Sequence, residues 1–466
     1  MDILDQCRAA IGDRYVLTGA DCAKWTTDWT GQYQGDPIAV IRPADTHEVA
    51  AIMKIAHATE TAVVPVSGNT GLNGGAIARG GLQLSLDRLN QIEAIDTAGR
   101  TATVGAGVIL SQLHAAADDH DLIFPLTFGA RGSAMIGGAL STNAGGSNVL
   151  RYGNTRDLVL GIEAVMADGR VMNLMGALHK DNSGLNLKHL LIGAEGTLGV
   201  ITRAIVKLSP KPCAHATALV AMTDLPAALQ LLHHLQAVTS GDVEAFEYMS
   251  AAHMAGYARL HPKRQLPFAQ PHDVTILIEL GCTSPDAGGD GSRPIVTVLT
   301  DALAGMLETG HIIDASIAQN ESQRAQLWAI REAAAEVAFA RKPFVDTDVA
   351  VGLSDVPAFL SRMTARLHAL DQGADELAVA HLGDGNIHYL VYPTRDDAAL
   401  DVAIRETVED VVQDLAGSFS AEHGVGLSKL GSMTRRKDPV ALDAMRAIKA
   451  ALDPKGILNP GKMIPS

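Results

Sequence analysis

In the first two hundred residues, segments with apolar side chains at helical spacing alternate with short apolar runs typical of strands. Residues 45–60, DTHEVAAIMKIAHATE, carry apolar side chains at helical spacing, and Asp45 with Glu48 predicts a capped helix start. The short apolar run AVVPV at 62–66 is typical of a buried strand. Further predicted elements are strands at 81–86 and 101–108, a helix around 111–119, and a hairpin over 162–174 that turns at Asp168-Gly169. This part of the chain is therefore predicted to mix helices and strands.

A different pattern begins after Pro210 and Pro212, which mark the predicted domain boundary. Beyond them, apolar helical patterns alternate with short extended runs. The predicted elements are helices at 225–238, 294–309 and 321–340 and strands at 272–280, 311–318 and 345–351. The glycine-rich stretch 285–294 is predicted to be an exposed loop. This pattern indicates a sheet covered by helices.

The length and composition of the chain indicate the number of domains and a globular protein. A chain of 466 residues exceeds one typical core, and size alone suggests two or three domains. Apolar residues make up 47% and charged residues 19%, which excludes a mostly disordered chain. We therefore expect a protein that is globular throughout.

The net charge of the chain limits the classes of partner that it can bind. The formal net charge is −15, so the overall field would repel nucleic acid and anionic membrane surfaces. No apolar run reaches the roughly 20 residues of a membrane span, and the acidic start lacks a signal-peptide core. The four cysteines form no CxxC pair that would indicate a cluster, a zinc knuckle or a redox dithiol. These features predict a cytoplasmic protein and do not exclude peripheral contact with a membrane.

The stretch HLGDGNIHY, residues 381–389, places two histidines around an Asp-Gly pair. If Asp384-Gly385 forms a two-residue turn, His381 faces His388 across the hairpin. Directly opposed side chains have β-carbons about 4.5–5.5 Å apart, which two ligands of one metal can bridge. The alternative is a surface hairpin with two ordinary histidines, because a one-residue shift of the turn breaks the pairing.

The segment SAEHGVG, residues 420–426, offers a third ligand. In an extended segment the side chains of Glu422 and His423 point in opposite directions, so one faces a metal while the other addresses a ligand beside it. His381, His388 and Glu422 then form a two-His, one-carboxylate set with an open position, and His423 can act as a base. Taken alone, the Glu-His pair also fits a solvated loop, and such a metal set also serves hydrolases.

Three glycine-rich clusters occupy residues 65–75, 129–157 and 192–202. The first, PVSGNTGLNGG, follows a predicted strand and presents a run of backbone N–H groups that suits a pyrophosphate. It lacks the Lys-Ser/Thr ending of a nucleoside triphosphate loop, and no GxGxxG opens the chain. Each cluster alone fits tight turns. Three within one domain predict a groove for a large phosphate-bearing cofactor.

The motifs together resemble a known flavoprotein family. The sequence is similar to the family typified by vanillyl-alcohol oxidase, and within it to the FAD-linked D-2-hydroxy acid dehydrogenases that act on lactate, 2-hydroxyglutarate or glycolate. The similarity covers nearly the whole chain and rests on PVSGNTGLNGG, IGGALSTNAGGSNVLRYGNTRDLVLGIEAVMADG, KDNSGLNLKHLLIGAEGTLGVIT, HLGDGNIH, SAEHGVGLSK and DPKGILNPGKM.

The resemblance implies an α+β fold with a two-subdomain FAD-binding domain over 1–210 and a ferredoxin-like α+β substrate domain over 211–418. Residues 419–466 would return to the flavin and complete the active site. The first glycine loop, SGNTG, lacks the histidine that tethers FAD in some members, so we expect non-covalent FAD. The residues that the resemblance places against FAD are Pro65, Val66, Ser67, Gly68, Asn69, Thr70, Gly71, Gly74, Pro125, Ser133, Gly137, Gly138, Thr142, Asn143, Ala144, Gly145, Glu195, Gly196, Gly199, Val200, Ile201 and Asn459.

The resemblance also implies a divalent metal, usually zinc, on His381, His388 and Glu422, with His423 as base. The metal lowers the pKa of the substrate hydroxyl, and hydride moves to the flavin as His423 takes the proton. Arg331 matches the arginine that binds the substrate carboxylate, although by itself it fits a solvated helix face.

One position departs from the family pattern. The hydroxyglutarate and lactate members carry an acid-binding lysine where this chain has Asp346. A carboxylate that faces the pocket would disfavour a dicarboxylate substrate. Arg324 and Lys429 are two alternative sources of compensating charge, and the acid itself stays open.

The predicted activity is oxidation of a D-2-hydroxy acid to the 2-oxo acid. The expected electron acceptor is a separate partner, either an electron-transfer flavoprotein, a quinone or a cytochrome. The alternatives are an oxygen-using oxidase, a metal hydrolase without flavin, and a flavin subunit that serves only assembly or electron transfer. A homodimer is the expectation for a soluble oligomer, and a eukaryotic member of this type would lie in the mitochondrial matrix.

Overall fold

The computed structural model describes residues 2–283 and 294–465. The chain forms two compact units: unit 1 is Met1–Gly145, Gly153–Lys211 and Glu422–Ser466, and unit 2 is Gly146–Tyr152 and Pro212–Ala421. The exposed loop predicted at 285–294 falls, apart from Pro294, outside the described residues.

Unit 1 contains two main sheets. A four-stranded sheet has the order β1-β2-β4-β3, with β2 and β3 both parallel to β4, and an antiparallel five-stranded sheet has the order β5-β6-β10-β8-β9. The strands are β1 (Val16–Leu17), β2 (Ala39–Ile41), β3 (Val63–Val66), β4 (Leu82–Ser85), β5 (Ile92–Asp96), β6 (Thr101–Gly105), β7 (Leu122–Ile123), β8 (Val159–Val165), β9 (Val171–Leu174), β10 (Val200–Lys207) and β11 (Ser209–Pro210). The helices are α1 (Ile3–Ile11), η1 (Asp13–Tyr15), η2 (Gly19–Trp25), α2 (Thr46–Thr59), α3 (Leu110–Asp118), α4 (Ile136–Thr142), α6 (Lys188–Leu191), α14 (Leu430–Arg436) and α15 (Pro439–Leu452).

Helix α2 links the cores of these two sheets. Its residues Ile52 and Met53 are fully buried in a cluster that also contains Leu82 of β4 and Val200 of β10. The predicted cap is confirmed, because the Asp45 carboxylate accepts the Glu48 backbone N–H at 2.9 Å. The periodicity of the sequence therefore placed this helix correctly.

Unit 2 is built on one antiparallel seven-stranded sheet with the order β15-β12-β14-β13-β17-β18-β16. The strands are β12 (Ala214–Met222), β13 (Val243–Met249), β14 (Val274–Cys282), β15 (Ile312–Ile317), β16 (Val345–Ala350), β17 (Asp375–His381) and β18 (Asn386–Tyr392). The helices are α5 (Val149–Tyr152), α7 (Leu225–Val238), α8 (Ala251–Leu260), α9 (Ile295–Glu308), α10 (Glu321–Glu332), α11 (Ala334–Phe339), η3 (Leu353–Asp355), α12 (Val356–Leu370) and α13 (Ala398–Asp414). The predicted helix over 321–340 is interrupted at Ala333.

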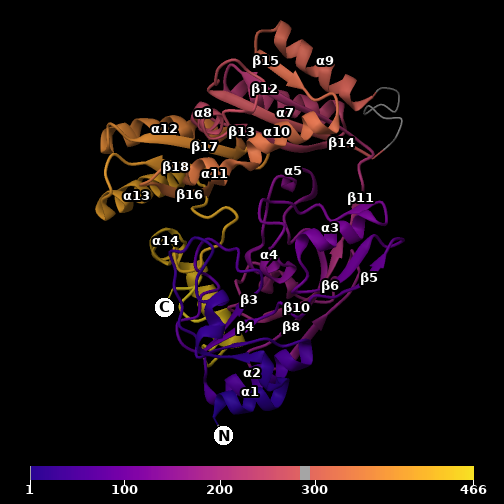
Figure 1. The fold of residues 1–466 in the computed structure, drawn as a ribbon, viewed down its shortest axis with the longest axis vertical. Coiled ribbons are helices and arrows are strands. Elements are labelled where there is room, and N and C mark those ends of the chain that lie inside the picture. Colours follow the sequence, from indigo (N-terminus) through magenta and orange to yellow (C-terminus); the bar gives the residue numbers. More distant parts are fainter. Residues whose placement is uncertain (1, 284–293, 466) are drawn as a thin grey trace. The chain divides into compact units, whose positions relative to one another are not determined.

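Helices cover both faces of this sheet (Figure 1). Alternate residues of β12 point to opposite faces: Val220 joins the core with α7, α9, α12 and α13, and Leu219 joins the core with α8, α10 and α11. Because both faces are buried, the central strands β12 and β14 read as nearly continuous apolar runs. The predicted helix-covered sheet is confirmed.

The segment Gly146–Tyr152 was predicted within the first domain, but it belongs to unit 2. The Arg151 guanidinium pairs with Asp242 at 2.6 Å and Glu244 at 3.1 Å, and the Tyr152 hydroxyl donates to Glu244 at 2.7 Å. These partners lie on or beside β13, so the segment is anchored to the large sheet.

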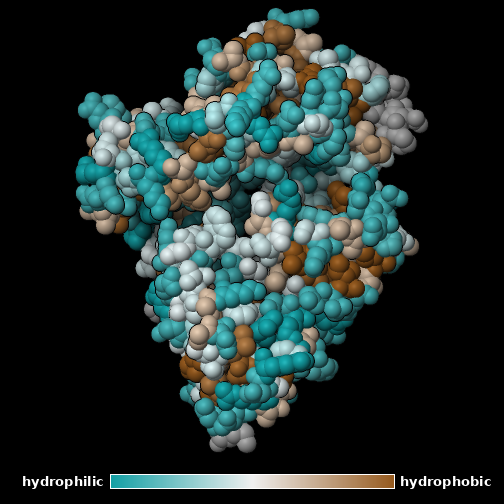
Figure 2. All heavy atoms as spheres, in the orientation of Figure 1, coloured by the Kyte–Doolittle hydropathy of each residue, from teal (hydrophilic) through white to brown (hydrophobic). Residues whose placement is uncertain are grey.

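Figure 2 shows a surface on which hydrophilic residues predominate and hydrophobic residues gather in patches. Within residues 2–283 and 294–465, no helix is both long enough and apolar enough to cross a bilayer. The four cysteines are free thiols.

Candidate functional site

The three glycine clusters come together in unit 1. A β-carbon at Gly68 would lie 2.3 Å from the Ser133 carbonyl oxygen, so only glycine permits this close approach between the first and second clusters. The Glu195 N–H donates to the Ser141 carbonyl at 2.8 Å, which joins the third cluster to the second. Segments more than a hundred residues apart therefore border one region.

All residues predicted to contact FAD lie in unit 1. Pro65 and Val66 end β3, Ser67 to Gly74 form the loop after it, and Val200 and Ile201 begin β10. The others lie in the loop after β7 (Pro125), before α4 (Ser133), in α4 (Gly137, Gly138, Thr142), directly after α4 (Asn143, Ala144, Gly145), in the loop before β10 (Glu195, Gly196, Gly199) and in the C-terminal tail (Asn459).

The first glycine loop fits a phosphate-bearing cofactor. None of the backbone N–H groups from Ser67 to Gly75 donates a hydrogen bond to another residue in the described parts of the chain. Most of these residues are half-buried, and half-buried N–H groups without partners are costly unless water or a ligand accepts them. Successive free amides are what a pyrophosphate requires.

Three residues beside this region adopt a left-handed backbone that favours glycine. Asn143 has φ 51°, Glu195 has φ 49° and Asn459 has φ 42°. Such conformations cost free energy in non-glycine residues and are often retained at functional sites. Asparagine tolerates this conformation better than most residues, whereas glutamate adopts it rarely.

The C-terminal tail is fastened to the glycine clusters within unit 1. The Asn459 amide donates to the carbonyls of Gly75 at 3.0 Å and Glu195 at 2.6 Å. The Glu195 carboxylate accepts the N–H groups of Val425 and Gly426 at 2.7 and 2.8 Å. Asn73 also donates to the carbonyl of His423 at 2.9 Å. The tail that carries Glu422 and His423 is thus tied to the predicted cofactor loop.

His381 lies in unit 2 and is held by a buried carboxylate. Its Nδ1 is 2.8 Å from Glu247 Oε1, and Glu247 is 1% exposed. This contact fixes the orientation of the ring, as a carboxylate does for many metal-binding histidines. Burial alone would raise the pKa of Glu247, but the charges of His381 and Arg331 outweigh burial and hold that pKa below its ordinary value.

Arg331, the predicted carboxylate-binding residue, is also buried beside Glu247. Its Nε donates to Glu247 Oε2 at 2.7 Å, and its Nη2 is 3.5 Å from His381 Nδ1. The solvated helix face that Arg331 could have occupied is therefore excluded, since the residue is 8% exposed.

The predicted two-residue turn at Asp384-Gly385 is wrong. His381 pairs with Asn386, and His388 pairs with Val379, so the histidines are not directly opposed. The N–H groups of Asp384 and Gly385 both donate to the His381 carbonyl, which closes the turn over 382–385. The two rings are diagonal neighbours on one face, with centroids 5.5 Å apart.

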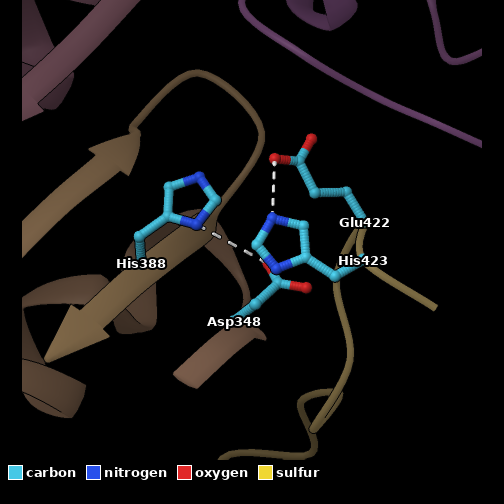
Figure 3. A group of neighbouring side chains, drawn as sticks. All are labelled: Asp348, His388, Glu422 and His423. Carbon is cyan, nitrogen blue, oxygen red and sulfur yellow. Dashed lines mark ion pairs between the residues drawn. The ribbon is translucent and has the colours of Figure 1, made fainter. Parts of the chain in front are cut away.

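Asp348 joins His388 on this face. The residues are paired across β16 and β18, and His388 Nδ1 lies 3.9 Å from Asp348 Oδ1 (Figure 3). Asp348 is 3% exposed. Asp348 and Glu247 could not be predicted from the sequence, because a lone acidic residue in a strand carries no signal of its partner.

The prediction that Glu422 and His423 point in opposite directions is wrong. Their side chains lie beside each other, with Glu422 Oε1 3.8 Å from His423 Nε2 (Figure 3). The segment bends instead of extending, and Gly424 has φ 75°. Within unit 2, the N–H of Ala421 donates to the Asp348 carbonyl at 3.3 Å, and Glu422 is the next residue in the chain.

Arg324, considered as a compensating charge, has another partner. Its guanidinium forms two hydrogen bonds to Glu279, at 2.7 and 2.5 Å. Asp346 lies on β16 two residues before Asp348, so both side chains emerge on one face of the sheet. The structure therefore leaves a carboxylate, not a lysine, beside His388 on that face.

Family profiles match both halves of the chain. Residues 37–175 match "FAD binding domain", and residues 211–463 match "FAD linked oxidases, C-terminal domain".

Full-length relatives give a finer grouping. The chain is 38% identical over 472 residues to the D-2-hydroxyglutarate dehydrogenase of Xanthomonas citri pv. viticola, covering 99% of this chain and 96% of the relative. It is 36% identical to the mitochondrial D-2-hydroxyglutarate dehydrogenase of Bos taurus, covering 100% of this chain and 84% of the relative.

Solved structures of lower identity share the fold. A p-cresol methylhydroxylase with substrate bound has a TM-score of 0.77 at 17% identity, covering 100% of this chain and 96% of that one. An alkyldihydroxyacetonephosphate synthase has a TM-score of 0.73 at 16% identity, covering 98% and 84%. With its converging glycine clusters and both family profiles, the chain belongs to the FAD-linked oxidases of the vanillyl-alcohol oxidase type, among the homologues of D-2-hydroxyglutarate dehydrogenase.

Proposed function

We propose that this flavoprotein oxidises a D-2-hydroxy acid to the 2-oxo acid with the help of a divalent metal, and passes the electrons to a separate acceptor. The observation that carries the proposal is the buried Glu247–His381 contact of 2.8 Å on the sheet face that also bears His388 and Asp348. Full-length similarity to enzymes named for a 2-hydroxy acid supports the substrate class.

The donor set fits a metal such as zinc. We propose His381, His388 and Glu422 as ligands, with Asp348 as a further candidate, because the two histidine rings and Asp348 are neighbours on one sheet face, and imidazole and carboxylate are the ligands that zinc takes in catalytic sites. Bound metal and FAD would supply Lewis acidity and a hydride acceptor. His423 accepts the hydroxyl proton, Arg331 faces the substrate carboxylate, and Glu247 keeps the His381 ring in one orientation.

The proposal is tested by mixing the protein anaerobically with D- and L-2-hydroxy acids while following flavin absorbance near about 450 nm. We expect bleaching by a D-acid and none by its L-enantiomer. Absence of bleaching by every acid would refute the activity. Rapid reoxidation by air would instead identify an oxidase that needs no separate acceptor.

Removing metal should suppress the reaction while leaving the flavin bound. Dialysis against a chelator is expected to lower the rate of bleaching by about a hundredfold or more, since a Lewis-acidic metal contributes several kcal/mol to such steps. Added Zn²⁺ should restore the rate, and the spectrum of oxidised flavin serves as the control. An unchanged rate in metal-free protein would contradict the metal role.

Replacing Asp346 by lysine should change substrate preference. A lysine at this position on β16 would offer a charge-assisted hydrogen bond to a second carboxylate, worth about 1.5–3 kcal/mol. We expect kcat/KM for D-2-hydroxyglutarate relative to D-lactate to rise by about tenfold or more. Asp314→Lys makes the same charge change on the exposed face of β15 and should leave the ratio unaltered. An unchanged ratio in Asp346→Lys would place Asp346 outside the substrate pocket.

A further inference from the structure

The C-terminal tail of unit 1 buries a lysine that no element of the proposed reaction uses. Lys462 is 5% exposed, and its ammonium donates to Asn459 Oδ1 at 2.9 Å. An ammonium has three N–H donors. Among residues 2–283 and 294–465, Asn459 is its one hydrogen-bond acceptor. Two of the three N–H donors of this buried ammonium are therefore left for a ligand.

The acidic neighbour of Lys462 does not take up these donors. Both carboxylate oxygens of Glu195 accept backbone N–H groups, from Val425 and Gly426. Burial lowers the pKa of Lys462 to about 8, with Arg79 acting in the same direction and Glu195 opposing it. A buried charge without an ion pair is costly unless a bound group of opposite or polar character compensates it.

The position of Lys462 indicates which part of FAD it meets. Its partner Asn459 also binds the carbonyl of Gly75, at the end of the first glycine loop. The next residue, Met463, donates its N–H to Gly426, three residues after His423. The ammonium therefore lies where the loop meets the segment of the catalytic base. Because the proposed base acts on a substrate held against the reacting ring, that ring, rather than the pyrophosphate, is expected at this end.

We propose that the Lys462 ammonium contacts the pyrimidine edge of the isoalloxazine and stabilises the negative charge that the ring gains on reduction. In the reaction the substrate C–H bond breaks, hydride carries two electrons to the ring, and the hydroxyl proton goes to His423. The 2-oxo acid leaves, and the reduced ring holds one extra negative charge next to Lys462. The inference rests on the flavin part of the proposed function and not on the identity of the acid.

Sulfite binding tests this without any substrate, because sulfite adds to oxidised flavin and leaves negative charge on the same edge. In the FAD-loaded protein, Lys462→Met should weaken sulfite binding by about tenfold or more, the size of one charge interaction. Lys462→Arg should keep the affinity near that of the parent protein. Lys455→Met removes a surface lysine that bonds to His57 and Glu60, and should leave sulfite binding unchanged.

Sulfite affinity in Lys462→Met equal to that of the parent would overturn the proposal. Weaker FAD binding with unchanged sulfite affinity would assign Lys462 to the pyrophosphate instead. A lower melting temperature of the apoprotein, not rescued by arginine, would make its role structural. If Lys462→Met loses FAD, Lys462→Gln is compared instead, because glutamine removes the charge but keeps N–H donors. Failure of every hydroxy acid to bleach the flavin would refute the proposed reaction and leave the sulfite result standing.

Discussion

Replacing His423 by alanine is expected to lower the rate of anaerobic flavin bleaching by a D-2-hydroxy acid by about 10²- to 10⁴-fold, the usual contribution of a positioned base. The hydroxyl proton then has no nearby acceptor while hydride leaves. The backbone of His423 is held by Asn73, so the tail keeps its place when the imidazole is removed. Stopped-flow absorbance under saturating substrate measures the effect.

His234→Ala is a matched control, because His234 is exposed on α7. It should bleach at the parent rate. If His423→Ala also bleaches at that rate, with its flavin spectrum unaltered, His423 is not the base.

Replacing Glu247 by alanine is expected to destabilise the protein by about 3–5 kcal/mol, because removal of one partner of a buried ion pair leaves the other charges uncompensated. The charges concerned are those of Arg331 and His381, both bonded to Glu247. The free energy of unfolding in urea measures the loss. Metal content should fall too, since the His381 ring is no longer fixed.

Glu308→Ala, at the exposed end of α9, is the control and should change stability little. Equal stability of the two variants would show that the Glu247 contacts make no net contribution to the free energy of unfolding.

The same carboxylate predicts a pH dependence. The folded pKa of Glu247 is held below its unfolded value, although burial by itself would raise it, so the unfolded state binds more protons as the pH falls. Its stabilising contribution is therefore complete above the unfolded carboxylate pKa and is lost as the pH falls through the folded pKa. In the Glu247→Ala variant this loss should disappear from the acid limb of the stability curve.

Local patterns were sufficient for several of the elements and for a phosphate-bearing cofactor. The helix α2 and its Asp45 cap depend on residues at most four positions apart, and the apolar runs of β12 and β14 follow from burial on both faces. The glycine loop after β3 could be predicted as well, because free backbone N–H groups need only short side chains nearby.

The side-chain contacts between strands could not be predicted in this way. The sequence determined by itself that His381 and His388 flank a turn. The turn, however, closes over four residues instead of two. This change in turn length alters every cross-strand pair of the hairpin but leaves the pattern of apolar and polar residues the same. Only the sheet order, with β13 beside β17, brings Glu247 to His381 across 134 residues. Hydrophobic periodicity is a property of neighbouring residues, whereas the contacts that orient a catalytic side chain are set by which strands lie next to each other.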